Sequence, residues 1–340
     1  MYRIRQFSLR IAGYISLVLR VWKQVLLALI AIVLVGAAAY FLMGSSTAPG
    51  TTRNSIQAPA SANKSTAGNN NAAAANKTIA HIFIIVEENR VAGSVVGNPG
   101  APYINSLINQ YALATNYSGV THPSLPNYLA LTSGSNDGIT TDCNPPGAGC
   151  IVNVASIADE IEASGRTWKE YAEGMPSPCY QLNSGNYATK HVPFLYYQDV
   201  IANSSRCKAH VVPFTQLAVD LKSASTTPDY AFISPNLCND MHNCSLSTGD
   251  SWLASNVPLI LNSPAFTSTR SLLVITWDEG DVSDNSVAAI LAGSAAKRHY
   301  SSGLAYNHYS LLHTIEWAWG LKPLTANDAN APLMNGFIQP

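Results

Sequence analysis

Two continuous apolar runs stand out in the hydrophobic pattern of the chain beyond residue 78. Residues 81–86 read His-Ile-Phe-Ile-Ile-Val, and residues 271–277 read Ser-Leu-Leu-Val-Ile-Thr-Trp. Runs of this length that are rich in β-branched residues are typical of central parallel strands buried on both faces. The sequence therefore predicts that both segments are inner strands of one sheet.

Weaker segments of helical and strand periodicity alternate around these two runs. Helical spacing covers 103–111, 154–164, 251–261 and 306–319, and a further helix is expected to begin at Ser124. Strands are expected at 167–171, 229–234 and 287–291. Such alternation predicts an α/β fold, with a doubly wound and mostly parallel central sheet flanked by helices.

The first 78 residues have a different composition. Residues 25–43 form an uncharged, largely apolar run of 19, preceded by a basic segment over 1–24. This pattern predicts one transmembrane helix with a cytoplasmic N-terminus, or alternatively a signal peptide that is cleaved near Ala37–Ala39. Residues 44–78, rich in Ser, Thr, Ala and Asn, read as a flexible linker, and 79–340 as a single folded domain. The domain is expected outside the cell membrane, either anchored to it or secreted.

Composition and cysteine content bear on the kind of ligand and on disulfide formation. Charged residues make up 11% of the chain and the formal net charge is −1, so no basic field for nucleic acid is present. All six cysteines follow residue 142, and an even number in an exported domain suggests disulfides. Sequence proximity favours three pairs out of 15 possible arrangements: Cys143–Cys150, Cys179–Cys207 and Cys238–Cys244.

Acidic residues directly follow both apolar runs. Glu87-Glu88-Asn89 ends the first and Asp278-Glu279 ends the second. Because ligands bind beyond the carboxyl ends of parallel strands, both acidic pairs are expected to open into one crevice. Their oxygens suit a hard divalent cation better than they suit a solvated turn.

Ser124 is the candidate nucleophile. It lies in His122-Pro123-Ser124-Leu125-Pro126-Asn127, where unpaired backbone N–H groups and the helix dipole favour an oxyanion or a phosphate group. A serine at a helix start is also a common N-cap, so both roles remain open from this segment alone.

Several short motifs together resemble one known family. They occur in the family's order and cover 87–90, 101–105, 122–128, 234–242, 277–280 and 306–312. From about His81 onward the chain resembles the phosphoesterase family of acid phosphatases and phospholipases C, a branch of the alkaline-phosphatase-like superfamily. Val91-Ala92-Gly93-Ser94 departs from the phospholipase pattern, so the resemblance is closer to the acid-phosphatase-like branch.

The resemblance implies an alkaline-phosphatase-like fold and a set of site residues. It implies that Ser124 attacks phosphorus and that His242 and His308 contact the phosphate or the leaving group. It also implies a divalent metal ion held by Glu88, Asn89, Ser124, Asp278 and Glu279. An oxygen ligand set admits Ca²⁺, Mg²⁺ or Mn²⁺, and added imidazoles would admit Zn²⁺ or Fe.

The expected function is a membrane-tethered, extracytoplasmic, metal-dependent phosphoesterase that hydrolyses phosphate monoesters through a phosphoserine intermediate. The expected partner is a small phosphoester or a phospholipid head group, with no nucleic acid. Two alternatives remain open: a phospholipase C-type phosphodiesterase, and a metal-independent serine esterase that uses Ser124, His308 and an acidic residue.

Overall fold

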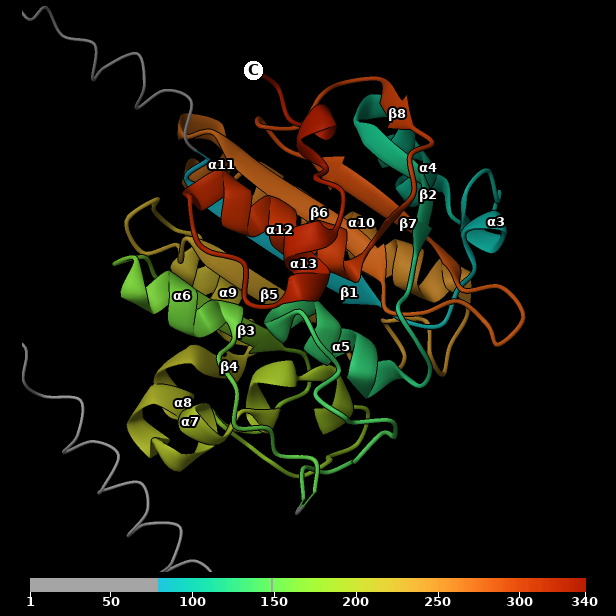
Figure 1. The fold of residues 1–340 in the computed structure, drawn as a ribbon. Helices are drawn as coiled ribbons and strands as arrows, with labels where there is room; N and C mark the ends of the chain where they lie inside the picture. Colours follow the sequence, from blue (N-terminus) through green and yellow to red (C-terminus); the bar gives the residue numbers. More distant parts are fainter. Residues whose placement is uncertain (1–78, 148) are drawn as a thin grey trace, which may run out of the picture. The chain divides into compact units, whose positions relative to one another are not determined.

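The computed structural model describes residues 79–147 and 149–340 (Figure 1). The predicted cytoplasmic segment 1–24, the predicted membrane span 25–43 and the predicted linker 44–78 lie outside the described residues. Among the residues that are described, no helix combines the length and the apolar character that a bilayer crossing requires.

The first apolar run forms the central strand of the sheet. Strand β1 (His81–Glu87) is buried along its whole length and pairs in parallel with β5 (Tyr230–Ser234) on one side and β6 (Ser271–Trp277) on the other. The prediction of buried, parallel inner strands is therefore confirmed. Because the three strands run in the same direction, Glu87, Ser234 and Trp277 all end at one edge of the sheet.

The described sheet has nine strands in the order β4-β3-β5-β1-β6-β7-β2-β8, with β9 also paired to β2. Strands β3 (Trp168–Ala172) and β4 (Val211–Pro213) continue the parallel half. Strand β7 (Ser286–Ala292) instead runs antiparallel to both β6 and β2 (Ala112–Ser118). The strand predicted at 287–291 is thus present, and its antiparallel direction makes the sheet mixed, where the sequence predicted a mostly parallel one without indicating the direction of this strand. The outer strands are β8 (Tyr300–Ser302) and β9 (Tyr306–Asn307).

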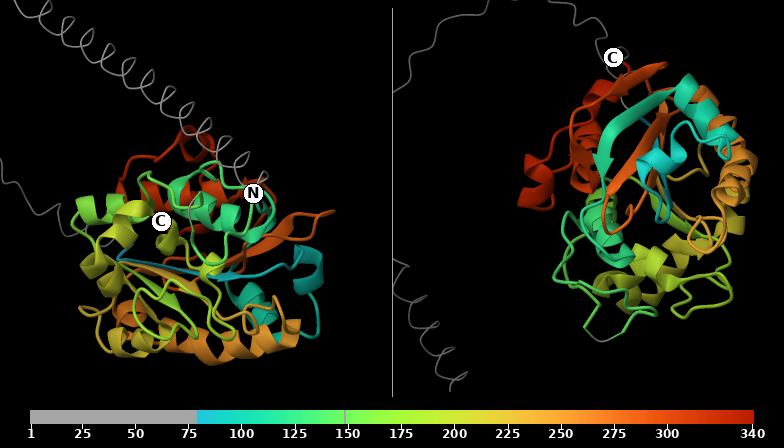
Figure 2. Two further views of the ribbon diagram at one scale, coloured as in Figure 1. Left: turned by 90° about the horizontal axis from the view of Figure 1, so that it is seen from below. Right: turned by 90° about the vertical axis from the view of Figure 1, so that its right-hand side faces the viewer.

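Helices cover both faces of the sheet (Figures 1 and 2). One face carries α5 (Ser124–Ser133), α6 (Ile157–Ala163) and α12 (His308–Trp319), and the other carries α4 (Pro102–Gln110) and α10 (Leu246–Leu261). The remaining elements are short: α3 (Ala92–Val95), η1 (Thr189–His191), η2 (Pro193–Tyr196), α7 (Gln198–Ala202), α8 (Ser204–His210), η3 (Phe214–Gln216), α9 (Leu217–Asp220), α11 (Pro264–Ser268), α13 (Ala326–Asn330) and η4 (Asn335–Phe337).

Side-chain caps account for two helix starts that differ from the predicted ones. The helix predicted at 154–164 begins only at Ile157, because Ser156 forms a capping box with Asp159. The helix predicted at 251–261 begins five residues earlier, because the side chain of Ser245 accepts a hydrogen bond from the backbone of Thr248. The helices predicted at 103–111 and 306–319 are confirmed as α4 and α12.

All three predicted disulfides are present. They join Cys143 to Cys150, Cys179 to Cys207 and Cys238 to Cys244. The third closes a short loop that follows β5, and the first closes a loop that follows α5. Two of the three cross-links therefore stabilise loops near the ends of elements that reach the candidate site.

Candidate active site

Ser124 is the first residue of α5, not its N-cap. The N-cap is Pro123, which follows a cis peptide bond, and no side chain caps this helix. Ser124 is 1% exposed, and its hydroxyl donates a hydrogen bond to Oε2 of Glu88 over 3.0 Å. The capping role left open by the sequence is therefore wrong, and the hydroxyl points to a carboxylate at the end of β1.

Glu88 and Asp278 meet where β1 and β6 end. The backbone N–H of Asp278 donates to the carbonyl of Glu87 over 3.0 Å, and that of Asn89 donates to Oδ1 of Asp278 over 3.1 Å. Asn89 has a φ of 52°, a conformation that Asn tolerates better than most residues. The sharp turn at Asn89 thus joins the two acidic segments that the sequence predicted to share a crevice.

Buried negative charge accumulates at this point. Burial and the charges of Asp278 and Asp240 raise the pKa of Glu88 well above its usual range. Burial likewise raises the pKa of Asp278 to about 7. Each carboxyl is fully buried, so neither can lower its energy by contact with water. The arrangement favours either a bound proton or a cation beside Ser124.

Glu279 points to a neighbouring pair of side chains. One of its oxygens lies 2.8 Å from Nδ1 of His122 and accepts a 3.3 Å hydrogen bond from the amide of Asn127. Burial and the charge of Asp278 raise its pKa to about 8. Asn127 also accepts hydrogen bonds from the backbone of Val120 and of Thr121, so it holds the segment before Ser124 against Glu279.

His242 lies at the rim of the same site. It sits inside the loop that the Cys238–Cys244 disulfide closes, and its Nε2 is 3.4 Å from Nζ of Lys190. Its other ring nitrogen contacts Oδ1 of Asn243 at 2.8 Å. The imidazole is partly exposed, so a substrate can reach it.

His308, which the resemblance implied would contact the phosphate or the leaving group, lies among protein atoms. It is fully buried, with Nδ1 3.0 Å from the hydroxyl of Tyr117 and Nε2 2.6 Å from the backbone oxygen of Asp278. Burial lowers its pKa to about 4, so the ring is neutral. Protein atoms contact both ring nitrogens of His308. This geometry suits a residue that holds Asp278 in place more than a residue that contacts the leaving group.

Three buried residues of the site were missed by sequence analysis. His191 places Nε2 3.0 Å from Glu88 and Nδ1 3.1 Å from Asp240, and Lys190 donates to Asp142 over 2.8 Å. Asp240 belongs to the motif at 234–242, but only His242 of that motif was predicted to be a site residue. Lys190 and His191 lie in the one-turn helix η1, where no apolar run signals that they reach the sheet edge.

The donor set fits a hard divalent cation. Asn89 Oδ1 and Asp278 Oδ2 are buried without a hydrogen-bond partner among the described residues. Within 79–147 and 149–340, no three His, Cys, Asp or Glu side chains alone form a metal site. The expected ligand set instead adds the hydroxyl of Ser124 and the amide oxygen of Asn89 to its carboxylates. Buried carboxylates and unpaired oxygens are the chemistry that Mg²⁺, Mn²⁺ or Ca²⁺ would satisfy.

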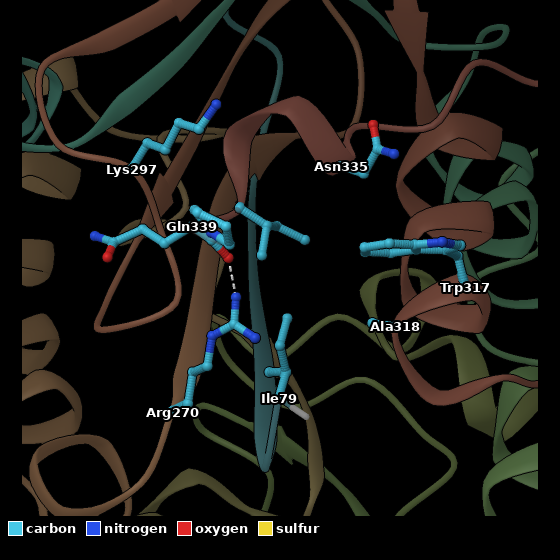
Figure 3. A pocket seen from close by; sticks show the side chains of 9 residues that line it. Ile79, Arg270, Lys297, Trp317, Ala318, Asn335 and Gln339 are labelled. Atoms are coloured by element: carbon cyan, nitrogen blue, oxygen red, sulfur yellow. Dashed lines mark hydrogen bonds between the residues drawn. The ribbon is translucent and has the colours of Figure 1, made fainter. Parts of the chain in front are cut away.

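A separate cavity of about 570 Å³ lies at the opposite end of the sheet, beside the residues that precede β1 and β6 (Figure 3). Arg270 donates there to the backbone oxygen of Gln339. The cavity is lined by Ile79, Arg270, Lys297, Trp317, Ala318, Asn335, Ile338, Gln339 and Pro340. Its lining includes none of the predicted site residues, so the candidate chemistry does not belong to it.

Comparison with known proteins finds similarity to one family and to several phosphatases. The profile of the Phosphoesterase family matches residues 98–322. The chain is 36% identical over 262 residues to a phosphatidylinositol-3-phosphatase of Mycobacterium tuberculosis, covering 77% of this chain and 83% of that protein. It is 32% identical over 242 residues to an acid phosphatase of Aspergillus fumigatus, covering 67% of this chain and 53% of the fungal protein.

Solved structures share the fold at low sequence identity. A protein in the alkaline phosphatase superfamily from Vibrio parahaemolyticus has a TM-score of 0.53 at 13% identity, covering 76% of this chain and 71% of that one. This likeness supports the alkaline-phosphatase-like architecture expected from the sequence and carries no statement about substrate.

Proposed function

Because this chain belongs to the phosphoesterase family, it is a hydrolase of phosphoric esters, and we propose that it removes phosphate from monoesters by using Ser124 as the nucleophile. The observation that carries the proposal is the 3.0 Å hydrogen bond from the Ser124 hydroxyl to Glu88 at the start of α5. The hydroxyl of Ser124 thereby meets a proton acceptor at a helix end that favours negative charge.

In the proposed reaction the oxygen of Ser124 forms a bond to phosphorus while the bond from phosphorus to the leaving alkoxide breaks. The hydroxyl proton passes to Glu88, and His242 at the rim donates a proton to the leaving oxygen. Water then attacks the phosphoserine and gives a proton back to His242, while the bond from phosphorus to the serine oxygen breaks. Glu88 returns its proton to the serine oxygen, and inorganic phosphate leaves. His308 holds the backbone oxygen of Asp278 throughout.

A divalent cation belongs to the proposal. Glu88, Asn89, Ser124, Asp278 and Glu279 would hold it. When bound, it neutralises charge on the phosphoryl group and lowers the pKa of the serine hydroxyl. Support comes from the raised pKa values of Glu88, Asp278 and Glu279, since burial disfavours their ionised forms and a bound cation would stabilise them.

A monoester is favoured over a diester as substrate by the similarity to proteins named acid phosphatase and phosphatidylinositol-3-phosphatase. A small phosphate ester and a phosphorylated lipid head group present the same terminal phosphate. The phospholipase C-type diesterase stays the second candidate within the family. The serine esterase is disfavoured, because the hydroxyl of Ser124 contacts Glu88, whereas His308 contacts Tyr117 and the backbone of Asp278.

We place this activity outside the cytoplasm. The three disulfides support that placement, because such bonds persist in oxidising compartments. The basic and apolar pattern over 1–43 supports either a membrane anchor or a cleaved signal.

The proposal is tested by Ser124→Ala with 4-nitrophenyl phosphate as substrate. Turnover is expected to fall by about 10⁴-fold or more while the circular dichroism spectrum is unchanged. The matched control is Ser255→Ala, which removes an exposed hydroxyl that bonds the backbone of Ser251 on α10. Mass spectrometry after an acid quench is expected to find phosphate on the peptide that contains Ser124. Full activity in Ser124→Ala would refute the nucleophile, and full activity after chelation would refute the metal.

A further inference from the structure

Lys190 brings a positive charge to the edge of the sheet where the carboxylates gather. Its side chain is 10% exposed, and its Nζ donates to Oδ2 of Asp142 over 2.8 Å. The same nitrogen lies 3.4 Å from Nε2 of His242, the imidazole proposed to meet the leaving group. Lysine is seldom this buried unless its charge has partners, so the position of Lys190 requires a reason.

The ammonium group of Lys190 stays charged in this environment. Burial by itself lowers the pKa of Lys190, but the negative charges of Glu88 and Asp142 outweigh it and raise the pKa above its ordinary value. Lys190 therefore acts electrostatically on the carboxylates that surround Ser124.

Asp142 connects Lys190 to the start of α5. Its Oδ1 accepts a 3.0 Å hydrogen bond from the backbone N–H of Leu125, the residue after Ser124, and its Oδ2 accepts from Lys190. One carboxylate thus spans a helix N-terminal donor and an ammonium group. The non-bridging oxygens of a phosphoryl group are the same kind of acceptor, and the substrate must bring them next to Ser124.

We propose that Lys190 binds a non-bridging oxygen of the substrate phosphate and selects phosphate monoesters over diesters, with Asp142 as the residue that positions it. The inference rests on the proposed function and specifies its substrate class. The phosphoryl group of a monoester carries two negative charges near neutral pH, whereas that of a diester carries one. Beside the buried carboxyls of Glu88 and Asp278 the second charge increases the repulsion, and the ammonium group of Lys190 offsets part of it.

The test compares two esters that share a leaving group, 4-nitrophenyl phosphate and methyl 4-nitrophenyl phosphate. We expect Lys190→Met to lower kcat/KM for the monoester by about 100-fold and for the diester by less than about 10-fold. The inhibition constant of inorganic phosphate is expected to rise by about 10-fold or more. If the wild-type enzyme does not hydrolyse the diester, the inhibition constant of inorganic phosphate alone tests whether Lys190 binds the phosphate.

Four further variants separate a loss of phosphate binding from a loss of structure. Lys190→Arg keeps the charge and is expected to recover part of the loss, while Asp142→Asn is expected to raise KM for the monoester by a smaller factor. The matched control is Lys169→Met, because Lys169 of β3 donates to Asp220 of α9 over 2.6 Å, in a lysine–aspartate pair outside this site. Its kinetics are expected to match those of the wild type. Lys190→Gln replaces Lys190→Met if the latter does not fold.

The two proposals fail in different ways. A wild-type enzyme that hydrolyses neither ester contradicts the proposed function. An active wild type whose Lys190→Met variant loses monoester and diester activity equally, or keeps the wild-type inhibition constant for phosphate, contradicts the role of Lys190 and leaves the function intact.

Discussion

At the scale of single residues, His191 connects two acidic groups that the sequence placed on different segments. Its ring stacks on Tyr128 with centroids 5.4 Å apart and planes 10° apart, and it lies within 3.1 Å of both Glu88 and Asp240. Tyr128 donates to Glu88 as well, over 2.6 Å. Burial and the charge of Lys190 lower the pKa of His191, so the ring is neutral. The orientation of Glu88, and through it that of Ser124, depends on this ring.

We expect His191→Ala to lower kcat by about 10- to 100-fold with little change in KM, because the ring orients Glu88 and does not meet the substrate. The cavity left behind is expected to lower the free energy of unfolding by roughly 2–3 kcal/mol. Steady-state kinetics and urea denaturation measure both effects, and His191→Gln is expected to recover part of kcat.

The control for this variant is His210→Ala. His210 ends α8, and its ring stacks on that of Trp168 with centroids 4.5 Å apart. A comparable loss of stability without a loss of kcat is expected there. Equal kcat losses in the two variants would contradict a specific role for His191.

The position of a residue in the fold decides whether the sequence alone can predict that it belongs to the site. Glu88, Asn89, Asp278 and Glu279 directly follow long buried strands, and the rule that such ends share an edge brought them together correctly. Ser124 could be predicted as a site residue because a helix start gives a local signal, and it does begin α5. Lys190 and His191 reach the site only through tertiary packing of a one-turn helix, and no local pattern reports that.

At the scale of elements, the loop between Cys238 and Cys244 carries two side chains of the site. It holds Asp240 beside His191 and His242 beside Lys190, and Met241 between them has a φ of 76°, a strained value for a side chain of that size. The disulfide limits the other conformations that this loop could adopt.

Replacing both cysteines of this loop by serine is therefore expected to lower kcat/KM by about 10-fold. The expected stability loss is roughly 2 kcal/mol, as chain entropy gives for so short a loop. The same substitution at Cys179 and Cys207, which are 28 residues apart, is expected to cost more stability, roughly 3–4 kcal/mol, and less activity. Steady-state kinetics and urea unfolding of the two variants measure these losses of activity and stability. An activity loss that simply follows stability across both would count against a special role for the first loop.

The elements that prediction missed share a physical cause. Strand β2 (Ala112–Ser118) has exposed Thr115 and Asn116 and an irregularity in its pairing between Ala114 and Tyr117, so it lacks the apolar run of a buried strand. Strand β7 has such a run and was found, but an apolar run looks the same in either direction. Its antiparallel orientation is decided by the short loop from β6, which leaves no room for a crossover helix.

At the scale of the whole molecule, the buried carboxyls of the site make stability depend on pH. Burial raises the pKa values of Asp240 and Asp278 to about 7 and that of Glu279 to about 8. Their unfolded values are close to 4, so between about pH 4 and pH 8 the native state holds more protons than the unfolded state. The free energy of unfolding must then decrease as pH rises through this window. For Asp278 alone, a shift from 3.8 to about 7 corresponds to roughly 4 kcal/mol at most.

In the presence of a chelator, the protein is therefore expected to be most stable near about pH 5 and to lose several kcal/mol by about pH 8, a large fraction of the ~5–15 kcal/mol typical of a folded domain. Added Mn²⁺ or Mg²⁺ is expected to flatten this dependence, because a cation stabilises the ionised carboxylates of the native state. Urea denaturation at several pH values, with and without the cation, measures both slopes, and Asp278→Asn is expected to reduce the slope in chelator. A stability that rises from about pH 5 to pH 8 in chelator would mean that the buried carboxyls are already compensated by charges of the chain itself, among them that of Lys190, which acts on Glu88.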